Sequence, residues 1–292
     1  MTTYTATVAT STTGAQFNIA AFSNEVNRFY KRQLIFADVC TDATGWAMGS
    51  PKGYASIAIP NISLLSGDGV GDTRTRAMTT ADAITFDSAT DTTTVLTIDQ
   101  YEYQGTGVVE AEAAISGYNI MEEYASACAE MLARKMDGHK ASYVDDISTN
   151  TVGAMMAPPS EEDLLYAIQL LDDGDVPQDN RSWVISNALW ASLMQMNRLT
   201  SIEFVERKPL ANGEIRDLYG FPCRKYNNVE GSNAAGHDNF YGRKNWMIYA
   251  NALRPKTHRF DDIDILGEKF AISAVWGCYI LRDDSAVWVK GP

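Results

Sequence analysis

The feature that most constrains the fold is one long run of helical periodicity near the middle of the chain. The run begins at Ser116 or Gly117 and continues to about Val144. A helix of roughly 28 residues is about 40 Å long at 1.5 Å per residue, well beyond the average globular helix. We therefore expect it to cross the whole molecule. Its apolar side chains recur at the i, i+3, i+4, i+7 spacing of one helix face: Met121, Tyr124, Ala125, Cys128, Met131, Leu132 and Met136.

Before this helix, from Asp38 to about Val109, the chain has a β pattern with long polar interruptions. Runs rich in β-branched and aromatic residues predict three strands, at Tyr54–Ile59, Ala83–Phe86 and Thr94–Tyr103. The intervening stretches at 67–72 and 87–94 are rich in turn residues and poor in apolar ones. The sequence therefore predicts a β-hairpin arm with little core of its own.

The N-terminal segment divides into a polar part and an amphipathic part. Residues 1–16 are rich in Thr, Ser and Ala and predict an extended or disordered arm. From Phe22 to Phe36 apolar and basic residues separate at helical spacing, which predicts a short amphipathic helix with a basic side. Its apolar residues are Phe22, Val26, Phe29 and Tyr30, and its basic residues are Arg28, Lys31 and Arg32.

After the long helix the pattern alternates between helix and strand. Ser160 followed by three acids is typical of a helix N-terminus, and Asn187 is expected to cap a second helix. Short buried strands are predicted at Ser182–Ile185 and Trp246–Tyr249. A long strand is predicted from Lys269 to Leu281, with Ala286–Val289 as its partner. The predicted fold class is α+β.

Composition excludes several broad classes. The chain has 292 residues, 45% of them hydrophobic, and 24 basic against 37 acidic side chains give a net charge of −13. Such a chain can bury a core, and the acidic excess argues against wrapping nucleic acid with the whole surface. The sequence has no long apolar run and no secretory signal. We expect no membrane partner.

The motifs that could carry chemistry favour structural interpretations. The glycine-rich stretch 67–72 lacks both the following helix of a phosphate-binding loop and the final acid of a calcium loop. Asp137 and His139 are two residues apart, so a helix points them to different faces. The cysteines occur singly, without zinc-site spacing: Cys40, Cys128, Cys223 and Cys278. We expect no catalytic, cofactor-binding or metal-binding residues and no enzyme, with a small-molecule α/β enzyme as an alternative.

Charge is segregated along the chain. Between Arg76 and Arg134 all charged residues are acidic, and between Arg243 and Arg259 all are basic. Such segregation indicates that acidic parts of one copy meet basic parts of another, although a solvated acidic face is the alternative. The subunit-interface candidates are Asp82, Asp87 and Asp91 with Arg243, Lys244, Arg254 and Lys256. Basic candidates that face inward, or toward a neighbour's long helix, are Arg28, Lys31 and Arg32.

The order of these parts resembles a major capsid (coat) protein of tailed bacteriophages, with the Hong Kong ninety-seven-type fold and in the podovirus-coat-like family. Each motif is short, and the ordered series carries the resemblance. The matching residues are Glu25–Phe29, Val95–Gln100 with Tyr103, Met121–Ala125 continuing to Met136–Asp137, Val176–Pro177, Arg181–Ser186, Leu218–Pro222 and Asn227–Val229.

The resemblance implies a domain organisation. It places an N-arm with a short amphipathic helix at 1–53 and an extended loop, or E-loop, at 54–108. A peripheral domain built on the long helix, the spine helix, follows at 109–157. An axial domain is expected at 158–264, and the return strands of the peripheral domain at 265–292.

The resemblance also implies a function and partners. The chain is expected to self-assemble from pentamers and hexamers into the icosahedral shell around a double-stranded DNA genome. Assembly is expected in the host cytoplasm and the final location in the virion, with no cofactor. Expected partners are a separate scaffolding protein, a portal, a possible decoration protein and DNA bound through non-specific contacts. The alternative with the same fold is an encapsulin-like nanocompartment shell protein that packages a cargo enzyme.

Overall fold

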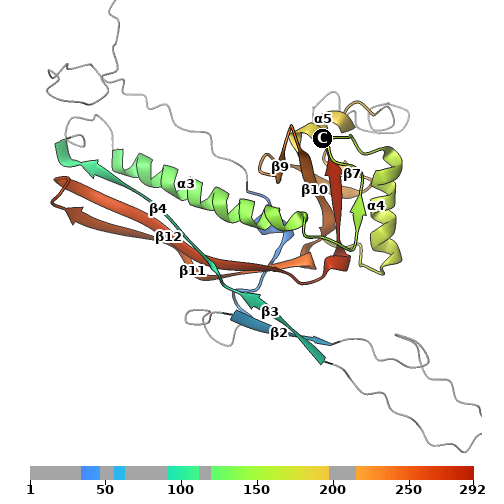
Figure 1. Ribbon diagram of the computed structural model, residues 1–292, viewed down its shortest axis with the longest axis horizontal. Coiled ribbons are helices and arrows are strands. Elements are labelled where there is room, and N and C mark those ends of the chain that lie inside the picture. The colour runs from blue at the N-terminus through green and yellow to red at the C-terminus, as the bar shows by residue number, and fades with distance from the viewer. Residues whose placement is uncertain (1–33, 47–55, 63–90, 112–119, 197–214) are drawn as a thin grey trace, which may run out of the picture.

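The computed structural model describes residues 34–46, 56–62, 91–111, 120–196 and 215–292. Within these ranges the chain forms two bodies that lie end to end (Figure 1). One is a long four-stranded sheet that carries helix α3, and the other is a compact seven-stranded sheet with helices α4 and α5. A two-stranded hairpin projects from the long sheet near the junction (Figure 1). The α+β prediction is confirmed.

The long sheet has the strand order β1–β11–β12–β4. Its strands are β1 (Thr41–Asp42), β11 (Met247–Asp262), β12 (Gly267–Ile280) and β4 (Gln100–Val109). The central strand β12 is antiparallel to both β11 and β4, and β1 pairs in parallel with the start of β11. With 14 residues, β12 is about 46 Å long in extended geometry. The sheet therefore extends far beyond the compact body.

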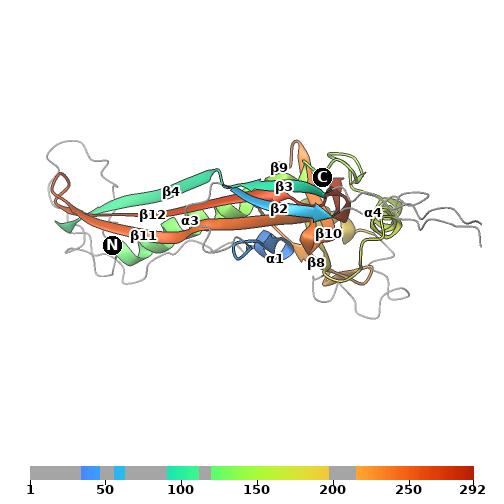
Figure 2. The same ribbon diagram turned by 90° about the horizontal axis from the view of Figure 1, so that it is seen from below.

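Helix α3 (Ile120–Ala141) lies along one face of the long sheet (Figures 1 and 2). Alternate residues of β12, among them Phe270, Ile272 and Trp276, form a core with Cys128 and Leu132 of the helix. The predicted long helix is confirmed, but its described part has 22 residues, about 33 Å. The 3-10 turn η1 (Ser142–Val144) follows it. Two residues of the expected apolar stripe, Tyr124 and Met131, are exposed.

The compact sheet has the strand order β5–β13–β10–β6–β8–β7, and β9 pairs with β10. Its strands are β5 (Thr151–Val152), β6 (Arg181–Ile185), β7 (Asp217–Leu218), β8 (Phe221–Lys225), β9 (Gly231–Ser232), β10 (Gly236–Arg243) and β13 (Ala286–Gly291). Residues of β6 and β10 alternate between two cores, with Trp183 and Tyr241 in one, and Val184 and Phe240 in the other. Both faces of this sheet are therefore covered by the chain itself.

Helices α4 (Glu161–Asp173) and α5 (Asn187–Leu193) cover one face of the compact sheet. The N-terminal signature of α4 is confirmed as a capping box. Ser160 Oγ accepts from the Asp163 N–H at 3.1 Å, and the Asp163 carboxylate accepts from the Ser160 N–H at 2.8 Å. The cap of α5 is Ser186, which accepts from the Leu189 N–H, rather than the expected Asn187.

The short helix α1 (Phe36–Val39) ties the two bodies together. Its buried residues pack in a core that includes α3 and residues from the compact sheet. The Trp246 indole N–H donates to the Val39 carbonyl at 3.2 Å. The Ile35 N–H donates to Asp137 of α3 at 3.3 Å. Of the predicted helix Phe22–Phe36, residues 22–33 lie outside the described residues, and α1 begins only at Phe36.

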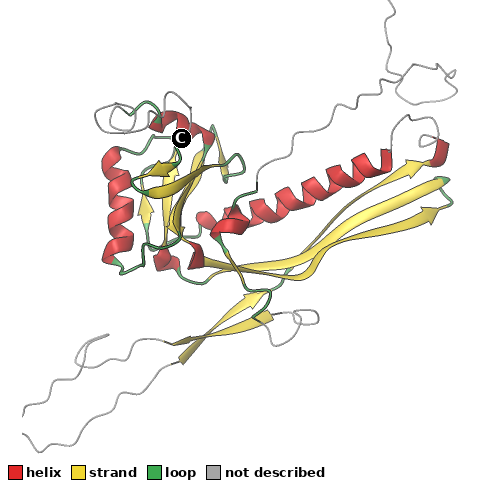
Figure 3. Ribbon diagram, turned by 180° about the vertical axis from the view of Figure 1, so that it is seen from behind, coloured by secondary structure: helices red, strands yellow, loops and turns green. Residues whose placement is uncertain are grey.

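The hairpin consists of β2 (Ser56–Ile62) and β3 (Asp91–Thr97). Figure 3 shows it on the side of the long sheet away from α3. Leu96 and Ile57 pack on Ile248 and Ala250 of β11. At Gly277 of β12 a Cβ would collide with the Thr97 carbonyl oxygen, so only glycine allows the hairpin backbone to cross so closely. The predicted strand Ala83–Phe86 lies outside the described residues.

Strand pairing corrects two sequence predictions. Ala286–Val289 lies in β13, which pairs with β10 and β5 and not with the strand at 269–281. The turn η3 (Asp283–Ser285) redirects the chain there, and the Asp283 carboxylate accepts hydrogen bonds from Ser148 and Thr149. The predicted strand Thr94–Tyr103 is two strands, because β3 ends at Thr97 and β4 begins at Gln100.

The expected domain boundaries do not follow the two sheets at the C-terminal end. The turn η2 (Lys244–Trp246) leads from β10 in the compact sheet to β11 in the long sheet. Residues 247–262, expected in the axial domain, thus belong with β12 and α3. Residues 286–291, expected with the peripheral domain, belong to the compact sheet.

Candidate assembly surface

The predicted interface residues fall at several separate places. Asp82 and Asp87 lie outside the described residues, and so do Arg28, Lys31 and Arg32. Asp91 begins β3, where it pairs with Ile62. The four basic candidates form no single cluster, since Arg243 and Lys244 lie at the junction, and Arg254 and Lys256 lie well along β11. The stretch from 247 to 256 is about 30 Å long in extended geometry.

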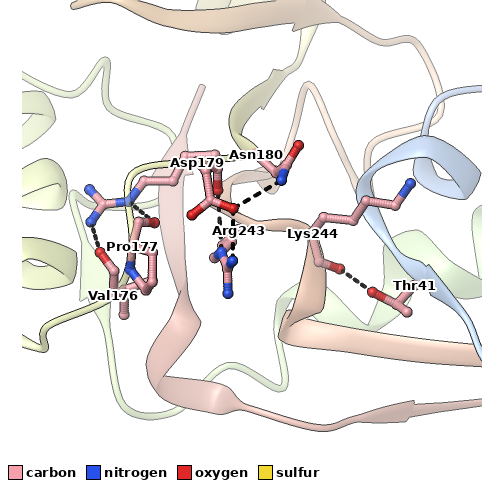
Figure 4. A network of polar contacts seen from close by, with 8 residues as sticks. Thr41, Val176, Pro177, Asp179, Asn180, Arg243 and Lys244 are labelled. Carbon is pink, nitrogen blue, oxygen red and sulfur yellow. Dashed lines mark hydrogen bonds and ion pairs between the residues drawn. The ribbon is translucent and has the colours of Figure 1, made fainter.

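Arg243 is engaged within its own chain. Its guanidinium donates to the Asp179 carboxylate at 2.8 Å and to the Asp179 carbonyl at 3.2 Å. The hydrogen bond from Arg243 lowers the pKa of Asp179 below its ordinary value. Figure 4 shows Arg243 turned toward Asp179, whereas the Lys244 side chain points away. The Lys244 carbonyl accepts from Thr41 Oγ1 at 3.1 Å, and its ammonium-bearing side chain is exposed.

Arg254 and Lys256 lie where β11 is irregular. The pairing of β11 with β12 shifts register between Asn251 and Leu253 and again between Leu253 and Lys256. Both basic side chains are exposed, and neither forms an ion pair with the described residues. Bulges bend a strand and re-aim its side chains. This segment therefore offers two cations that the described part of the chain leaves to solvent.

The largest unexpected feature is the face of the long sheet opposite α3, which we call the open face. Antiparallel pairing places four rows of residues across β4, β12 and β11 on this face. Tyr101, Tyr103 and Phe260 are 67%, 71% and 55% exposed, which is unusual for aromatic side chains. The rows are Tyr101–Val275–Leu253, Tyr103–Ser273–Lys256, Gly105–Ala271–His258 and Gly107–Lys269–Phe260.

The charge of the open face has one sign in these rows. Lys256, His258 and Lys269 are its ionisable side chains besides the tyrosines, and no acidic residue stands among the four rows. Lys269 is engaged by Asp262, whose pKa is lowered by the hydrogen bond from that lysine. Asp262 lies in the next row of the same face and offsets the charge of Lys269. The face is thus aromatic, with Lys256 as its basic side chain without an ion pair among the described residues, and it suits a partner that is partly apolar and acidic.

The carboxylate–histidine pair of the sequence is part of the core. The Asp137 carboxylate accepts from the Tyr226 hydroxyl and from the Ile35 N–H. His139 Nδ1 accepts from the Trp276 indole N–H at 3.2 Å, and burial lowers the pKa of this histidine. The two side chains bind different partners and do not converge, as their spacing predicts. The expectation of a structural histidine is confirmed.

The described residues form neither a metal-ligand cluster nor a membrane-spanning helix. In these ranges no group of three or more His, Cys, Asp or Glu side chains is placed to hold a metal ion. None of the helices described is both long enough and apolar enough to span a bilayer.

The chain is similar to known proteins in its structure. No protein-family model matches the chain, and no curated protein matches its sequence. A solved structure from Mycobacterium phage Che8 matches with a TM-score of 0.76 at 19% identity, over 94% of this chain and 97% of that one. The capsid of Cyanophage P-SCSP1u also matches with a TM-score of 0.76, at 15% identity over 94% and 93% of the two chains.

A third structure extends the comparison. The mature capsid of bacteriophage PhiM1 matches with a TM-score of 0.72 at 12% identity, over 93% of this chain and 91% of that one. In each case the match covers both the long sheet with α3 and the compact body, because more than nine-tenths of both chains align. The predicted architecture is thereby confirmed, and the chain has the Hong Kong ninety-seven-type fold of tailed-phage capsid structures.

Proposed function

We propose that the protein is a major capsid protein that self-assembles into the icosahedral shell around the double-stranded DNA genome of a tailed phage. The observation that carries the proposal is the open face of the long sheet. This sheet buries one face on α3 and leaves three aromatic side chains exposed on the other. In a shell, that surface is covered by a second copy. The likeness to the capsids of P-SCSP1u and PhiM1 supports this interpretation.

The segment between β2 and β3 is the part of a second copy that suits the open face. Its acidic residues include Asp82 and Asp87, and no Lys or Arg occurs after Arg76 until Arg134. Lys256 offers the opposite charge, and Tyr101 and Tyr103 offer apolar rings with polar tips. Each exposed ion pair contributes only about 0.2–1 kcal/mol, so burial of the aromatic rings supplies most of the contact energy.

Other roles follow from the same proposal. The compact body is the axial domain and the long sheet with α3 is the peripheral domain, in pentamers and hexamers. We further propose a separate scaffolding protein, a portal and non-specific contacts with packaged DNA as partners. The role is structural and not catalytic. The candidates for inward-facing contacts are Arg28, Lys31 and Arg32. Among the interface candidates we favour Arg254 and Lys256 over Arg243, because Asp179 already binds Arg243.

Electron microscopy of purified particles tests the proposal. Large shells filled with DNA are the expected result. Small shells with a protein cargo would instead indicate the nanocompartment. A monodisperse subunit that forms no shell at high concentration, in the presence or absence of cell extract, would contradict both.

A deletion tests the contact with the open face. Replacing residues 67–90 by a short Gly-Ser closure removes the segment that we propose binds the open face, but leaves β2, β3 and both sheets in place. We expect a folded, soluble subunit that fails to form stable shells. The matched control replaces Asp82 and Asp87 by Asn at full length and should weaken shells only at low salt. Deletion particles as resistant to heat and denaturant as the parent would contradict the contact.

A further inference from the structure

The two edges of the long sheet differ in how well they are protected from other chains. Beyond Tyr249 the edge formed by β11 pairs with no strand among the described residues. It carries Pro255, which has no N–H to donate, the exposed cations Arg254 and Lys256, and two shifts of register. Proline, cations and bulges are the features that keep a sheet edge from pairing with another chain. The β11 edge is therefore protected.

The edge formed by β4 has none of these features. Figure 2 shows β4 along one side of the long sheet, and β12 is the one strand that pairs with it within the described ranges. The ladder with β12 runs from Gln100 to Val109 without a shift of register. The strand contains no Pro, Lys or Arg, and Glu102 is its one charged residue. A long, regular edge of this kind is a template for a further strand.

The sequence of β4 is complementary to itself. In an antiparallel pair of two copies centred on Gln104, Tyr101 stands opposite Gly107 of the second copy, and Tyr103 stands opposite its Gly105. A ring that lies across a glycine on the neighbouring strand covers backbone that has no side chain of its own. Each of the two exposed tyrosines thus has a matching bare position on the second copy.

Other registers are less favourable. Centred on Gln104, residues 100–108 of one copy pair with the same residues of the other, and Glu102 stands opposite Thr106. A pair centred on Tyr103 includes only residues 100–106, and a pair centred on Gly105 leaves that glycine opposite itself. A pair centred on Glu102 places like charges opposite each other, which is destabilising. The self-complementary register is therefore the one centred on Gln104.

Helix α3 has a second apolar surface beside the same edge. Lys135 of α3 reaches Glu102 of β4 at 3.8 Å, so the side of the helix that carries Lys135 faces the β4 edge. Met131 and Tyr124 lie about one turn and about three turns before Lys135 on that side. Their exposed fractions are 53% and 47%. The described chain thus leaves two large apolar side chains next to its unprotected edge.

The strand surface and the helix surface share one axis. Helix α3 runs back along β4, and Glu102 lies beside Lys135 (Figure 1). From Glu102 to Gln104 the strand advances about 6.6 Å, which is the length of about four helix residues. The residue of α3 beside Gln104 is therefore Met131. A two-fold axis at Gln104 brings the Met131 side chains of the two copies together.

We propose that the β4 edge binds the β4 edge of a second copy in the antiparallel register centred on Gln104, and that Met131 and Tyr124 of the two α3 helices pack across the same two-fold axis. Both copies use the same surface, so the contact is isologous. The tyrosine rings keep their outer faces free, which makes this pairing compatible with coverage of the open face. The pairing goes beyond the proposed function, because two subunits form it without a closed shell.

Self-association of full-length subunits tests the contact. Sedimentation equilibrium below the concentration of shell formation should show monomers and dimers. Q104K places two lysines opposite each other at the axis and should raise the dissociation constant of the dimer about fivefold. The matched control T257K adds the same charge to the protected β11 edge and should leave it unchanged. Monomers at every concentration, or equal effects of the two substitutions, would overturn the proposal.

Charge reversal keeps the test valid if Q104K also lowers the stability of the subunit. Q104E alone should dimerise weakly for the same reason as Q104K. A mixture of Q104K and Q104E chains should form mixed dimers, which native mass spectrometry identifies when one chain carries a mass tag. Mixed dimers no more abundant than the two like dimers would contradict pairing at this residue.

Hydrogen exchange tests whether the β4 edge is free in the subunit. In an antiparallel edge strand about half of the amides point away from the neighbouring strand. Those of β4 should exchange quickly in dilute monomer and slowly in the dimer. Protection already present in the monomer would show that another segment of the same chain covers the edge, and the proposal would fail.

Cross-linking locates the axis. Q104C and M131C are each made with C223S, because Cys223 is only partly buried whereas the other three cysteines are buried. On mild oxidation each variant should form a disulfide with the same residue of a second copy, since residues on the axis face each other. The control R254C, exposed on the protected edge, should not. Dimers that cross-link at neither axis position would show another interface and overturn the proposal.

Shells separate this proposal from the proposed function. Shells that lack the Q104C cross-link, and that Q104K leaves as stable as the parent, would overturn the pairing and leave the proposed function standing. Dimers that cross-link at both axis positions but never form shells would support the pairing and reject only the proposed function.

Discussion

The two bodies of this molecule differ in how much of each sheet the rest of the chain covers. The compact sheet is covered on both faces, and Trp183 and Val184, neighbours on one strand, are both fully buried in different cores. The long sheet is covered on one face by α3, and on the other only near the junction, by the hairpin. Beyond the hairpin, Tyr103 on the open face is 71% exposed. A strand that is buried on both faces gains its stability within the chain. A strand with one face open to solvent can gain further stability only when a partner covers that face.

This difference separates stability of the subunit from stability of the assembly. Mutations in the compact body should unfold the subunit, and mutations on the open face should leave it folded but weaken association.

Trp183→Ala should have the largest effect. The indole is fully buried and stacks on Tyr241 with ring centroids 4.0 Å apart. Removing a buried Trp costs about 3–5 kcal/mol through lost transfer energy and the cavity left behind. Denaturant unfolding of the subunit measures the loss. Phe260→Ala on the open face is the control, and a loss of similar size there would contradict the contrast between the two bodies.

Asp283→Asn should have an intermediate effect at the junction. Partial burial raises the pKa of Asp283, but hydrogen bonds from Thr149 and Ser148 outweigh it and leave the pKa lowered. A lowered folded pKa means that the carboxylate stabilises the fold above its unfolded pKa, and that this contribution disappears as pH falls through the folded value. We expect a loss of about 1 kcal/mol at neutral pH that vanishes in acid. Unfolding curves of both proteins between pH 7 and pH 3 test it.

His139→Gln should have a smaller effect, confined to weakly acidic pH. Burial lowers the pKa of His139 from 6.5, despite the nearby Asp99 and Glu102, so the unfolded chain takes up the proton first. Stability of the parent should therefore fall as pH drops below about 6.5 toward the folded pKa. The introduced glutamine can still accept from Trp276 but does not titrate. Stability of the variant should be flatter over that range, and identical pH profiles for the two proteins would reject this assignment.

Tyr101→Ser with Tyr103→Ser should have almost no effect on subunit unfolding, within about 0.5 kcal/mol, because both rings are exposed. Shells should nevertheless dissociate at lower temperature or denaturant concentration. Differential scanning calorimetry of subunits and of shells separates the two quantities. Shells of unchanged stability would show that the open face is not an interface.

Residues close together in the sequence were sufficient to predict the elements that have one clear hydrophobic or capping pattern. The long helix, the capping box at Ser160 and the buried strand at Ser182–Ile185 all follow from residues close in sequence. The partner of β13 does not, because pairing between distant strands leaves no local signal. The division at Ile98–Asp99 is hidden for a similar reason: β3 and β4 share one continuous β pattern, although they belong to different sheets.

The sequence shows where the charged residues lie along the chain, but not which of them the fold engages. Charge segregation predicted interface residues in the basic stretch 243–259, and Arg254 and Lys256 within it are exposed. Arg243 is held by Asp179, which is 64 residues away in sequence, so its engagement could not be anticipated. The alternation of Tyr101 and Tyr103 is visible in the sequence, but Phe260 joins them only through the register of three strands.

The order of strands also sets when the molecule becomes able to associate during its synthesis. β12 stands between β4 and β11, and β13 stands between β5 and β10. The two sheets cannot both be complete until the ribosome has made residues 286–291, even though β4 and α3 emerge much earlier. Such long-range pairing slows folding. A nascent chain therefore has no finished open face to offer its neighbours on a polysome until β12, which ends at Ile280, has emerged from the ribosome.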